Sequence, residues 1–437
     1  QFTHAMIILM KSVTNNLSDT HWDVLVVGGG PAGMMAALHA KELAPHKKVL
    51  LLEKNSSLGK KLLITGGGRC NVTNSEFDTR KLLAHYKDSD KFLFSAFSQY
   101  SVKETLNFFH TRKMPTKVEN EGRTFPVSDS SKSVWNVLVH GMERLGVIVV
   151  TDAKVLGFSK KDNEAQSVRV SVKGKESEFK SKVFILATGG TSHPETGSTG
   201  DAYPWLTTLG HKVNIPKPVL VPVMIKDAWV KSLQGLTLNP VKITLRNKLE
   251  KVISKKGKIL FTHFGVTGPT ILNMSKQIGD MLADKKDVHL SLDVVPEQDH
   301  GKLNQSLQDL FAENKSKKIK NTLDQLVLNR LVDVVLSQSN IDLEKVCSQI
   351  TREERMRLID TLKNMTMKVS GLLGEDKAII ASGGVPLEEI DFRTMRSKIC
   401  PNICIVGDLL DIDRPSGGYS LQLCWTTGYV AGKSSIQ

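Results

Sequence analysis

The fold class is decided by the stretch Asp23-Val24-Leu25-Val26-Val27-Gly28-Gly29-Gly30-Pro31-Ala32-Gly33. Its first five residues are a valine-rich apolar run that stops at a glycine turn, which is typical of a buried parallel strand. Helical periodicity follows over 34–43, and a second apolar run over 48–52 ends at Glu53. This strand–turn–helix–strand unit predicts an α/β domain with a doubly wound, mostly parallel sheet.

The glycine spacing in the turn is that of a dinucleotide-binding fingerprint. Gly28 permits the tight turn, Gly30 lets a pyrophosphate approach the backbone, and Gly33 lets the helix pack closely on the strand. The phosphates would meet the helix N-terminus, which carries about half a positive charge. Glu53 can accept hydrogen bonds from an adenosine ribose, whereas its charge would repel a 2′-phosphate. The sequence therefore predicts a tightly bound dinucleotide other than NADP.

Two later motifs favour FAD over NAD. Thr188-Gly189-Gly190 follows an apolar strand at 182–187, and Gly407-Asp408 follows the last strand at 403–406. Both would lie at the carboxyl edge of the sheet, where such sheets bind ligands. In flavoproteins of the glutathione-reductase type, a late acid such as Asp408 binds the ribityl or pyrophosphate part of FAD. A helix cap or a surface turn is the alternative role for Asp408.

The residues between these motifs indicate a discontinuous domain. Segments 146–150, 153–158 and 168–172 are predicted to be strands of a small antiparallel layer. The pattern changes near residue 206, after which 219–225 and 241–245 alternate like half-buried strands. Helical periodicity is then predicted at about 302–315, 321–337 and 352–365, and the doubly wound pattern returns at 378–384.

We therefore predict a nucleotide-binding domain over 22–205 and 368–437, interrupted by an insertion over 206–367. Residues 1–21 lack the features of a signal peptide and are interpreted as a leader or tag remnant.

The longest motif in the chain is the block Gly59-Lys60-Lys61-Leu62-Leu63-Ile64-Thr65-Gly66-Gly67-Gly68-Arg69-Cys70-Asn71-Val72-Thr73-Asn74. Further motifs are Gly197-Ser198-Thr199-Gly200-Asp201, Thr262-His263-Phe264-Gly265-Val266-Thr267-Gly268-Pro269 and Ser382-Gly383-Gly384-Val385. With the motifs above and Thr426-Thr427-Gly428-Tyr429, they resemble the BaiN-type flavoproteins, which are NAD(P)/FAD-dependent oxidoreductases. The resemblance covers about residues 22–433.

One segment departs from the family pattern. It reads Asp411-Ile412-Asp413-Arg414-Pro415-Ser416, where the family has Asp-x-Asp followed by Gly-Tyr or Gly-Phe and Thr. The Arg-Pro pair is expected to alter the rim of the flavin pocket.

The resemblance implies a FAD domain of the two-dinucleotide-binding, glutathione-reductase type. The insertion is then a β-barrel at about 206–297 followed by a helical part at about 298–367. The fingerprint, Glu53 and Gly407-Asp408, with no motif for a covalent flavin linkage, predict that FAD is bound non-covalently. NADH or NADPH is expected as a transient hydride donor, because the sequence has no second intact G-x-G-x-x-G. The family includes a member tied to bile-acid dehydroxylation and a ribosomal-RNA dihydrouridine synthase. Hydride delivery to a carbon–carbon double bond conjugated to a carbonyl group is the reaction class that this implies.

The fingerprint and the resemblance together predict the FAD-binding residues. These are Gly28, Gly30, Pro31, Ala32, Gly33, Glu53, Lys54, Gly59, Lys60, Thr65, Gly66, Gly67, Gly68, Arg69, Asn71, Val155, Ala187, Thr188, Gly189, Gly407, Asp408, Gly418 and Leu421. The glycine run 66–68 would let backbone lie against the flavin ring, a loop hinge being the alternative. Arg69 would neutralise either the pyrophosphate or the substrate.

Three residues are candidates for the acid that protonates the substrate after hydride transfer. Cys70 is one, although a small buried thiol that packs near FAD is the favoured alternative. His263 is the second, because histidine titrates near neutral pH, and a hydrogen-bonded structural role is its alternative. Tyr419 is the weakest of the three.

The charge of the chain bears on its substrate. It has 59 Lys and Arg against 45 Asp and Glu, a net charge of +14, which favours an acidic partner such as nucleic acid or an anionic metabolite. A basic run at 251–258 is predicted to form a hairpin tip around Gly257, and a solvated hairpin is the alternative. The residues predicted to hold an RNA backbone are Lys248, Lys251, Lys255, Lys256 and Lys258. RNA, ribosomal and unfolded or single-stranded, is therefore the predicted partner, with a small enone-type metabolite as the alternative.

The composition excludes other classes. With 40% hydrophobic and 24% charged residues, the chain is neither disordered nor collagenous, and no apolar run reaches the ~20 residues of a membrane span. Five cysteines favour a reducing, cytoplasmic compartment. No metal site is expected, because Cys400 and Cys404 are not followed by a second pair.

Overall fold

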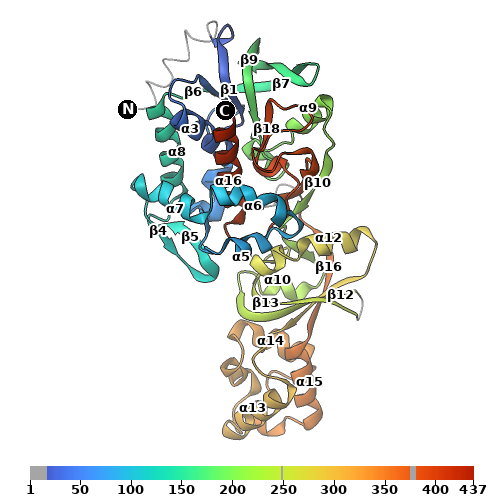
Figure 1. The fold of residues 1–437 in the computed structure, drawn as a ribbon. Coiled ribbons are helices and arrows are strands. Elements are labelled where there is room, and N and C mark those ends of the chain that lie inside the picture. The colour runs from blue at the N-terminus through green and yellow to red at the C-terminus, as the bar shows by residue number, and fades with distance from the viewer. Residues whose placement is uncertain (1–16, 248–249, 375–379) are drawn as a thin grey trace. The chain divides into compact units, whose positions relative to one another are not determined.

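The computed structural model describes residues 17–247, 250–374 and 380–437. The chain divides into two compact units, one within 1–218 and 379–437 and the other within 219–378 (Figure 1). Of the predicted leader, residues 1–16 lie outside the described residues. The rest belongs to the first unit, since the first strand begins at His21 and the Trp22 indole donates to the Leu17 carbonyl at 3.2 Å.

The first unit is built on a seven-stranded sheet with the order β6-β2-β1-β9-β8-β7, in which β18 also pairs with β9. Parallel pairing joins β1 to β2 and β9, β2 to β6, and β9 to β18. Antiparallel pairing adds β8 to β9 and β7 to β8. The strands are β1 (His21–Val27), β2 (Val49–Leu52), β6 (Ile148–Val150), β7 (Ala153–Lys161), β8 (Glu164–Val172), β9 (Lys175–Leu186) and β18 (Ile403–Ile405). This is a Rossmann-type α/β fold.

One strand prediction was wrong. The segment 146–150 was placed in the antiparallel layer, but Ile148–Val150 pairs in parallel with Leu50–Leu52. The helix that precedes it, α8 (Ser131–Leu145), supplies the crossover that a parallel strand needs.

Two helices that lead away from the sheet edge pack closely against each other. They are α3 (Pro31–Leu43) and α16 (Tyr419–Ser434), and they lie side by side in Figure 1. A Cβ at Gly428 would lie 2.5 Å from the Ala32 carbonyl oxygen, and one at Gly432 would lie 2.4 Å from that of Ala36. Glycine is therefore required at both positions, and the contact fixes the N-terminus of α16 relative to the fingerprint helix.

The remaining elements of the first unit surround this frame. They are α4 (Lys60–Ile64), β3 (Thr73–Asn74), α5 (Thr79–Ala84), α6 (Asp90–Gln99), α7 (Val102–Thr111), β4 (Thr116–Val118), β5 (Arg123–Pro126), α9 (Ala202–Leu209), β10 (Asn214–Val219) and β17 (Ile380–Gly384). Strands β10 and β17 pair with each other, so the first unit extends past the predicted boundary at 206. Leu220, with φ of 55°, interrupts the single strand predicted over 219–225.

The second unit contains a closed barrel with the order β11-β14-β13-β12-β15-β16. Its strands are β11 (Val223–Ile225), β12 (Thr237–Asn247), β13 (Glu250–Phe261), β14 (Gly265–Thr267), β15 (Val288–Asp293) and β16 (Met365–Leu372). Since β16 follows the helices in sequence, the span predicted for the barrel, 206–297, lacked the strand that closes it. The period-2 burial of Met365, Met367 and Val369 is the signal that marks this strand.

Helices make up the rest of the second unit. They are α10 (Ala228–Ser232), α11 (Pro269–Leu272), α12 (Ser275–Ala283), α13 (His300–Glu313), α14 (Asn329–Gln338) and α15 (Arg352–Lys363). The helix predicted over 321–337 starts later, at Asn329, because short 3₁₀ turns occupy Ile319–Asn321 and Leu323–Gln325.

The hairpin prediction around Gly257 was also wrong. Residues 251–258 lie inside β13, and Gly257 pairs with Val241 of β12. A Cβ at Gly257 would lie 2.3 Å from Oγ1 of Thr270, so this glycine allows α11 to pack on the strand and does not form a turn. The residues that join β12 to β13, 248–249, lie outside the described residues, and Lys248 is one of them.

Candidate functional site

A cavity opens at the carboxyl ends of β1, β9 and β18 in the first unit. It measures about 900 Å³, part of which is open to solvent. Fourteen of the predicted cofactor residues line it, and they come from five separate stretches of the chain. These are Gly28, Gly30, Pro31, Ala32, Glu53, Gly59, Lys60, Thr65, Ala187, Thr188, Gly189, Gly407, Asp408 and Leu421.

The fingerprint turn leaves room for a ligand at the start of α3. Gly30 is the N-cap of this helix, no side chain caps it, and its first turn carries no acid. A Cβ at Gly30 would have only the Ala187 carbonyl oxygen near it, at 4.0 Å, whereas one at Gly28 would lie 2.5 Å from that oxygen. The open side of Gly30 and the uncapped N–H groups suit a pyrophosphate.

Glu53 lines the cavity beside the fingerprint turn. Its carboxylate is 7% exposed. Oε2 accepts the Gly29 N–H at 2.8 Å, and Oε1 accepts both the backbone and the side-chain N–H of Asn55 at 2.8 Å. Because a carboxylate has about four lone-pair positions, Oε2 retains one for a ribose hydroxyl.

A loop at 196–198 forms another wall, and Lys54 holds it in place. Lys54 Nζ lies 2.6 Å from Oδ2 of Asp201 and 2.5 Å from Oγ1 of Thr199. Asn55 Nδ2 donates to the Thr196 carbonyl at 3.0 Å. Burial alone would raise the pKa of Asp201, but the bonds from Lys54 and Thr199 lower it. Lys54, predicted as a cofactor residue, therefore anchors a wall of the cavity and does not itself line it.

Asp408, which follows the last strand β18, also lines the cavity. Its Oδ2 lies 3.5 Å from Nζ of Lys61, and its Oδ1 accepts from Nη2 of Arg414. Burial alone would raise the pKa of Asp408, but Arg414 and Lys61 together lower it. Arg414 is 4% exposed and does not line the cavity. The Arg-Pro pair therefore does not form the rim itself, since the arginine lies behind Asp408.

Nine predicted cofactor residues do not line this cavity. They are Gly33, Lys54, Gly66, Gly67, Gly68, Arg69, Asn71, Val155 and Gly418. Several have evident packing roles: a Cβ at Gly33 would lie 1.9 Å from the Gly28 carbonyl oxygen, and one at Gly418 would lie 2.3 Å from the Thr73 carbonyl carbon. Asn71 Oδ1 accepts the Thr124 N–H at 3.0 Å. Val155 is buried in β7.

The glycine run and Arg69 lie on the surface beside the cavity-lining Thr65. A Cβ at Gly67 or Gly68 would meet nothing within 4 Å, although both residues have positive φ. The Arg69 guanidinium lies 4.2 Å from the centre of the Phe125 ring and pairs with Glu119 and Asp129. Its charge is thus balanced by two carboxylates of the same unit.

The three candidate acids differ in their surroundings. Cys70 has no exposed surface, and burial raises the pKa of its thiol to about 12, which favours the packing role. Tyr419 is 6% exposed with its ring centre 4.6 Å from that of His85, and burial raises the pKa of its hydroxyl. His263 is exposed in the turn between β13 and β14, with its ring 4.9 Å from that of Phe264.

Sequence reasoning missed several residues that line the cavity. They are Asn55, Lys61, Leu62, Thr196, Gly197, Ser198, Val406, Ser420 and Cys424. A signal existed for some of them, since Lys61 follows the predicted Lys60 in the same motif and Ser420 directly precedes the predicted Leu421.

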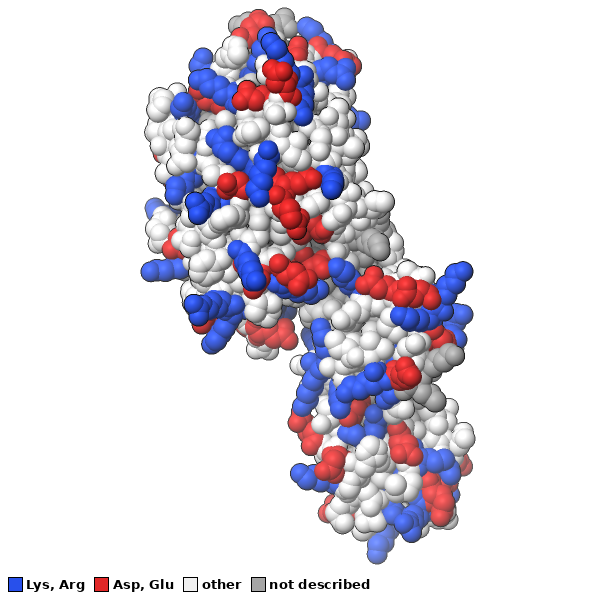
Figure 2. All heavy atoms as spheres, turned by 45° about the vertical axis from the view of Figure 1, so that its right-hand side comes forward, with Lys and Arg blue, Asp and Glu red and all other residues white. Residues whose placement is uncertain are grey.

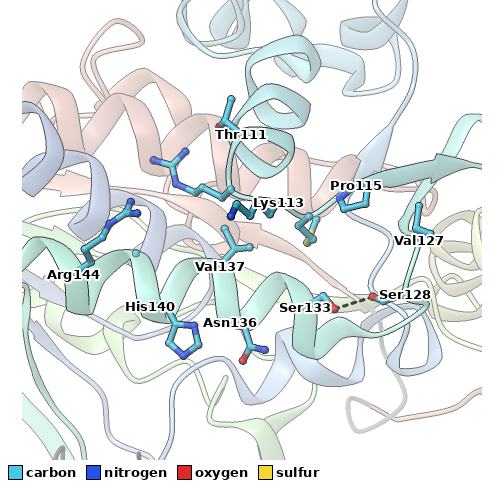
Figure 3. Close-up of a pocket in the computed structure, with 13 residues that line it drawn as sticks. Thr111, Lys113, Pro115, Val127, Ser128, Ser133, Asn136, Val137, His140 and Arg144 are labelled. Atoms are coloured by element: carbon cyan, nitrogen blue, oxygen red, sulfur yellow. Dashed lines mark hydrogen bonds between the residues drawn. The ribbon is translucent and has the colours of Figure 1, made fainter.

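A second pocket of the first unit lies between the end of α7, the end of β5 and one side of α8. Lys113, Asn136, Val137, His140 and Arg144 are among its lining residues (Figure 3). None of the residues predicted from the sequence lines it, and it has no glycine turn at a helix N-terminus.

The predicted RNA-binding lysines do not share one face of the barrel. Lys251 pairs with Arg246 across the sheet, Lys256 pairs with Lys242, and Lys255 pairs with the buried Ile243. Lys255 therefore points to the side opposite Lys251 and Lys256, because cross-strand partners share a face. Lys256 also lies 2.5 Å from Glu297. Lys258 is exposed.

A different set of basic residues does align. The pairing places Lys251 of β13, Arg246 of β12, His289 of β15 and Lys368 of β16 in one row across four neighbouring strands. Asp287 flanks the row, 3.2 Å from His289 and 2.8 Å from Lys368. Figure 2 shows acidic side chains among the basic ones on the visible face of this unit.

The described residues contain no metal-binding cluster, no membrane-spanning helix and no disulfide. Within 17–247, 250–374 and 380–437, no three His, Cys, Asp or Glu side chains are placed to hold a metal ion. None of the helices in these ranges is long and apolar enough to cross a membrane. All five cysteines are buried thiols without a disulfide.

Comparison with known proteins gives matches over nearly the whole chain. A model of the HI0933-like protein Rossmann domain matches residues 22–434. The 3-dehydro-bile acid delta(4,6)-reductase of Clostridium scindens is 26% identical over 417 residues, covering 94% of this chain and 98% of that protein. The ribosomal RNA dihydrouridine synthase of Haemophilus influenzae is 26% identical over 415 residues, covering 94% and 97%.

The fold is also found among solved structures. The 3-ketosteroid delta1-dehydrogenase of Sterolibacterium denitrificans matches with a TM-score of 0.56 and 11% identity, over 95% of this chain and 99% of that one. At this identity the likeness concerns the fold.

Proposed function

From the premise that this chain belongs to the HI0933-like Rossmann-domain family and is an FAD-dependent oxidoreductase, we propose that it reduces a carbon–carbon double bond conjugated to a carbonyl group. The observation that carries the proposal is the cavity lined by Gly30 at the N-terminus of α3, by Glu53 and by Asp408. We also infer that the FAD domain is of the two-dinucleotide-binding type.

The residues of the cavity divide the work of holding FAD. The N-terminus of α3 would bind the pyrophosphate, and the remaining lone pair of Glu53 would accept from the ribose. Asp408, Lys61 and the first turn of α16 would meet the flavin end. When bound, FAD would accept hydride from NADH or NADPH and deliver it to one carbon of the double bond.

A proton must reach the other carbon, so that one hydride and one proton saturate the bond. Tyr419 and His263 remain candidates for its donor. For Cys70, a pKa of about 12 supports a packing role. Replacing the side chain that acts as the general acid should reduce turnover by a factor of about 10²–10⁴.

The hydride donor would bind only transiently. The sequence has no second G-x-G-x-x-G, so a nicotinamide nucleotide would use the substrate cavity or another surface. This predicts ping-pong kinetics, in which the oxidised nucleotide leaves before the substrate binds. Stopped-flow mixing of the oxidised protein with each nucleotide tests it, and no bleaching of the flavin by either one would contradict it.

The first candidate substrate is a uridine of ribosomal RNA, converted to dihydrouridine. Support comes from the basic row of the barrel, in which Lys251, Arg246, His289 and Lys368 lie across four neighbouring strands. Basic side chains are common partners of phosphate oxygens. A base must leave its stack to meet a flavin, so unfolded or single-stranded RNA is the form that would bind.

The second candidate is a small enone-type metabolite, which the bile-acid reductase among the relatives supports. The two differ in their need for a phosphate backbone. Mass spectrometry of ribosomal-RNA nucleosides, with and without the protein and NADPH or NADH, is the decisive experiment. Unchanged dihydrouridine together with salt-independent turnover of a small enone would select the second candidate.

The five unpaired thiols support a reducing, cytoplasmic compartment in either case.

A further inference from the structure

Arg414, in the turn between β18 and α16, is buried, and all three of its guanidinium nitrogens donate hydrogen bonds. Its side chain is 1% exposed. Nη2 donates to Oδ1 of Asp408, Nη1 donates to the Ile412 carbonyl at 2.8 Å, and Nε donates to Oγ of Ser420 at 3.1 Å. A planar guanidinium bound through all three nitrogens has one orientation, so it fixes the groups that it binds.

The group it fixes forms part of the cofactor cavity. The Asp408 side chain is 15% exposed and lines the cavity. On the other side of the carboxylate, Lys61 Nζ lies 3.5 Å from Oδ2 and donates to Oγ of Ser192 at 2.5 Å. One carboxylate therefore faces two cations beside the first turn of α16, to which Ser420 belongs.

We propose that Arg414 is a positioning residue for FAD: it orients the Asp408 carboxylate at the cavity wall and, with Lys61, balances the charge of that carboxylate. The proposal rests on the proposed binding of FAD. The aligned carboxylate would accept a hydrogen bond from the cofactor. Because reduction adds negative charge, a nearby cation raises the midpoint potential of a bound flavin and a nearby carboxylate lowers it.

Two consequences separate this role from simple packing. Loss of either Arg414 or Asp408 should weaken FAD binding, because the carboxylate is either misplaced or absent. The two losses should shift the midpoint potential in opposite directions, since they remove opposite charges. A packing defect would not produce that difference in sign.

The experiment compares Arg414→Gln, Arg414→Lys, Asp408→Asn and the double variant Arg414→Gln/Asp408→Asn. The matched control is Arg112→Gln, which breaks another partly buried ion pair of the same unit, with Glu42 at 2.6 Å, away from the cavity. FAD is titrated into each apoprotein, and the midpoint potential of the loaded protein is measured against reference dyes.

We expect Arg414→Gln to raise the Kd for FAD by about tenfold, as loss of one well-placed charge-assisted hydrogen bond would, and to lower the potential. Asp408→Asn raises both the Kd and the potential. Arg414→Gln adds little to the Kd once Asp408 is Asn, because Arg414 acts through Asp408. Arg414→Lys recovers part of the potential, and Arg112→Gln changes neither quantity.

Potential shifts of the same sign in Arg414→Gln and Asp408→Asn, or additive effects on the Kd, would overturn the proposal. If Arg414→Gln does not fold, Ser420→Ala and Arg414→Lys replace it in the experiment. Unchanged FAD affinity and an unchanged midpoint potential in both variants would also overturn the proposal. A wild-type protein that binds no FAD contradicts the proposed function itself. Wild-type binding with Arg414→Gln indistinguishable from Arg112→Gln contradicts this inference alone.

Discussion

The backbone N–H of Gly29 donates to Oε2 of Glu53 at 2.8 Å, which ties the fingerprint turn to the end of β2. The same carboxylate accepts two bonds from Asn55 through Oε1. Glu53 therefore has a structural role in the apoprotein, in addition to the ribose contact for which it was predicted. A substitution at this position tests both roles.

Glu53→Ala should weaken FAD binding. The loss of a hydrogen bond to a charged group costs about 1.5–3 kcal/mol, or roughly 10- to 150-fold in Kd. Flavin fluorescence during titration of the apoprotein measures it. Glu143→Ala, at an exposed position on α8, is the control and should leave the Kd unchanged. A Glu53→Ala protein with the wild-type Kd would contradict the ribose contact.

Gly30→Ala and Gly33→Ala should fail in different ways. The backbone of Gly30 has φ of −77°, which alanine adopts readily, and its Cβ would enter the cavity. A Cβ at Gly33 would lie 1.9 Å from the Gly28 carbonyl oxygen. We expect Gly30→Ala to fold and lose FAD, and Gly33→Ala to be unstable. Thermal unfolding of both apoproteins, followed by FAD titration, distinguishes them, and an equally stable Gly33→Ala would contradict the packing argument.

Cys70 should behave as a packing residue. Burial raises the pKa of its thiol to about 12, so the thiolate is scarce at pH 8 and a thiol reagent should not modify it in the native protein. Cys70→Ser should reduce turnover less than tenfold, whereas loss of a general acid costs about 10²–10⁴. Steady-state kinetics with the identified substrate decides between the roles. Rapid labelling of Cys70 at pH 8 would show that the thiol is accessible.

The pair Lys54–Asp201 should give a pH-dependent contribution to stability. The pKa of Asp201 is lowered in the folded protein by bonds from Lys54 and Thr199, against the effect of burial. Such a group stabilises the fold above its unfolded pKa of about 3.9 and loses that contribution as the pH falls through the folded pKa.

The difference between wild type and Lys54→Met measures this contribution. The two side chains are 26% and 28% exposed, so we expect about 0.5–1 kcal/mol, or about 1–3 °C in the unfolding temperature, at pH 7. The difference should begin to shrink below about pH 4 and disappear once the pH is below the folded pKa of Asp201. A difference of the same size at pH 3 as at pH 7 would show that Lys54 stabilises the loop by packing and not by charge.

Site residues could be predicted from the sequence where they belong to one short motif, and not where they are far apart in the chain. Gly28, Gly30, Gly33 and Glu53 belong to one strand–turn–helix–strand unit, so their spacing alone predicts their arrangement. Lys61 and Asp408 are 347 residues apart in the chain, and their contact depends on how β18 enters the sheet. No local pattern predicts such a contact.

The strands of the barrel were also only partly predictable from local sequence patterns. The apolar alternation of β12 was visible in the sequence, but the closing strand β16 follows three helices, and the predicted boundary at 367 cut through it. The lysine run at 251–258 resembles a turn in sequence because Gly257 is a common turn residue. Only the contact with Thr270 reveals why glycine is needed there.

The alignment of charges on the barrel changes which residues should bind RNA. We expect Lys251, Arg246 and Lys368, changed together to glutamine, to weaken binding of single-stranded RNA, because all three project from one face. Each phosphate contact contributes about 0.7 to the slope of log affinity against log salt, so the slope should fall by about 2.

Lys255→Gln is the matched control, since Lys255 lies on the opposite face of β13 and should leave the slope unchanged. Reduction of FAD by NADH or NADPH should remain intact in every variant, because these residues belong to the second unit and the FAD cavity to the first. A triple variant that binds RNA with the wild-type slope would exclude this face as the RNA-binding surface and favour the small enone as substrate.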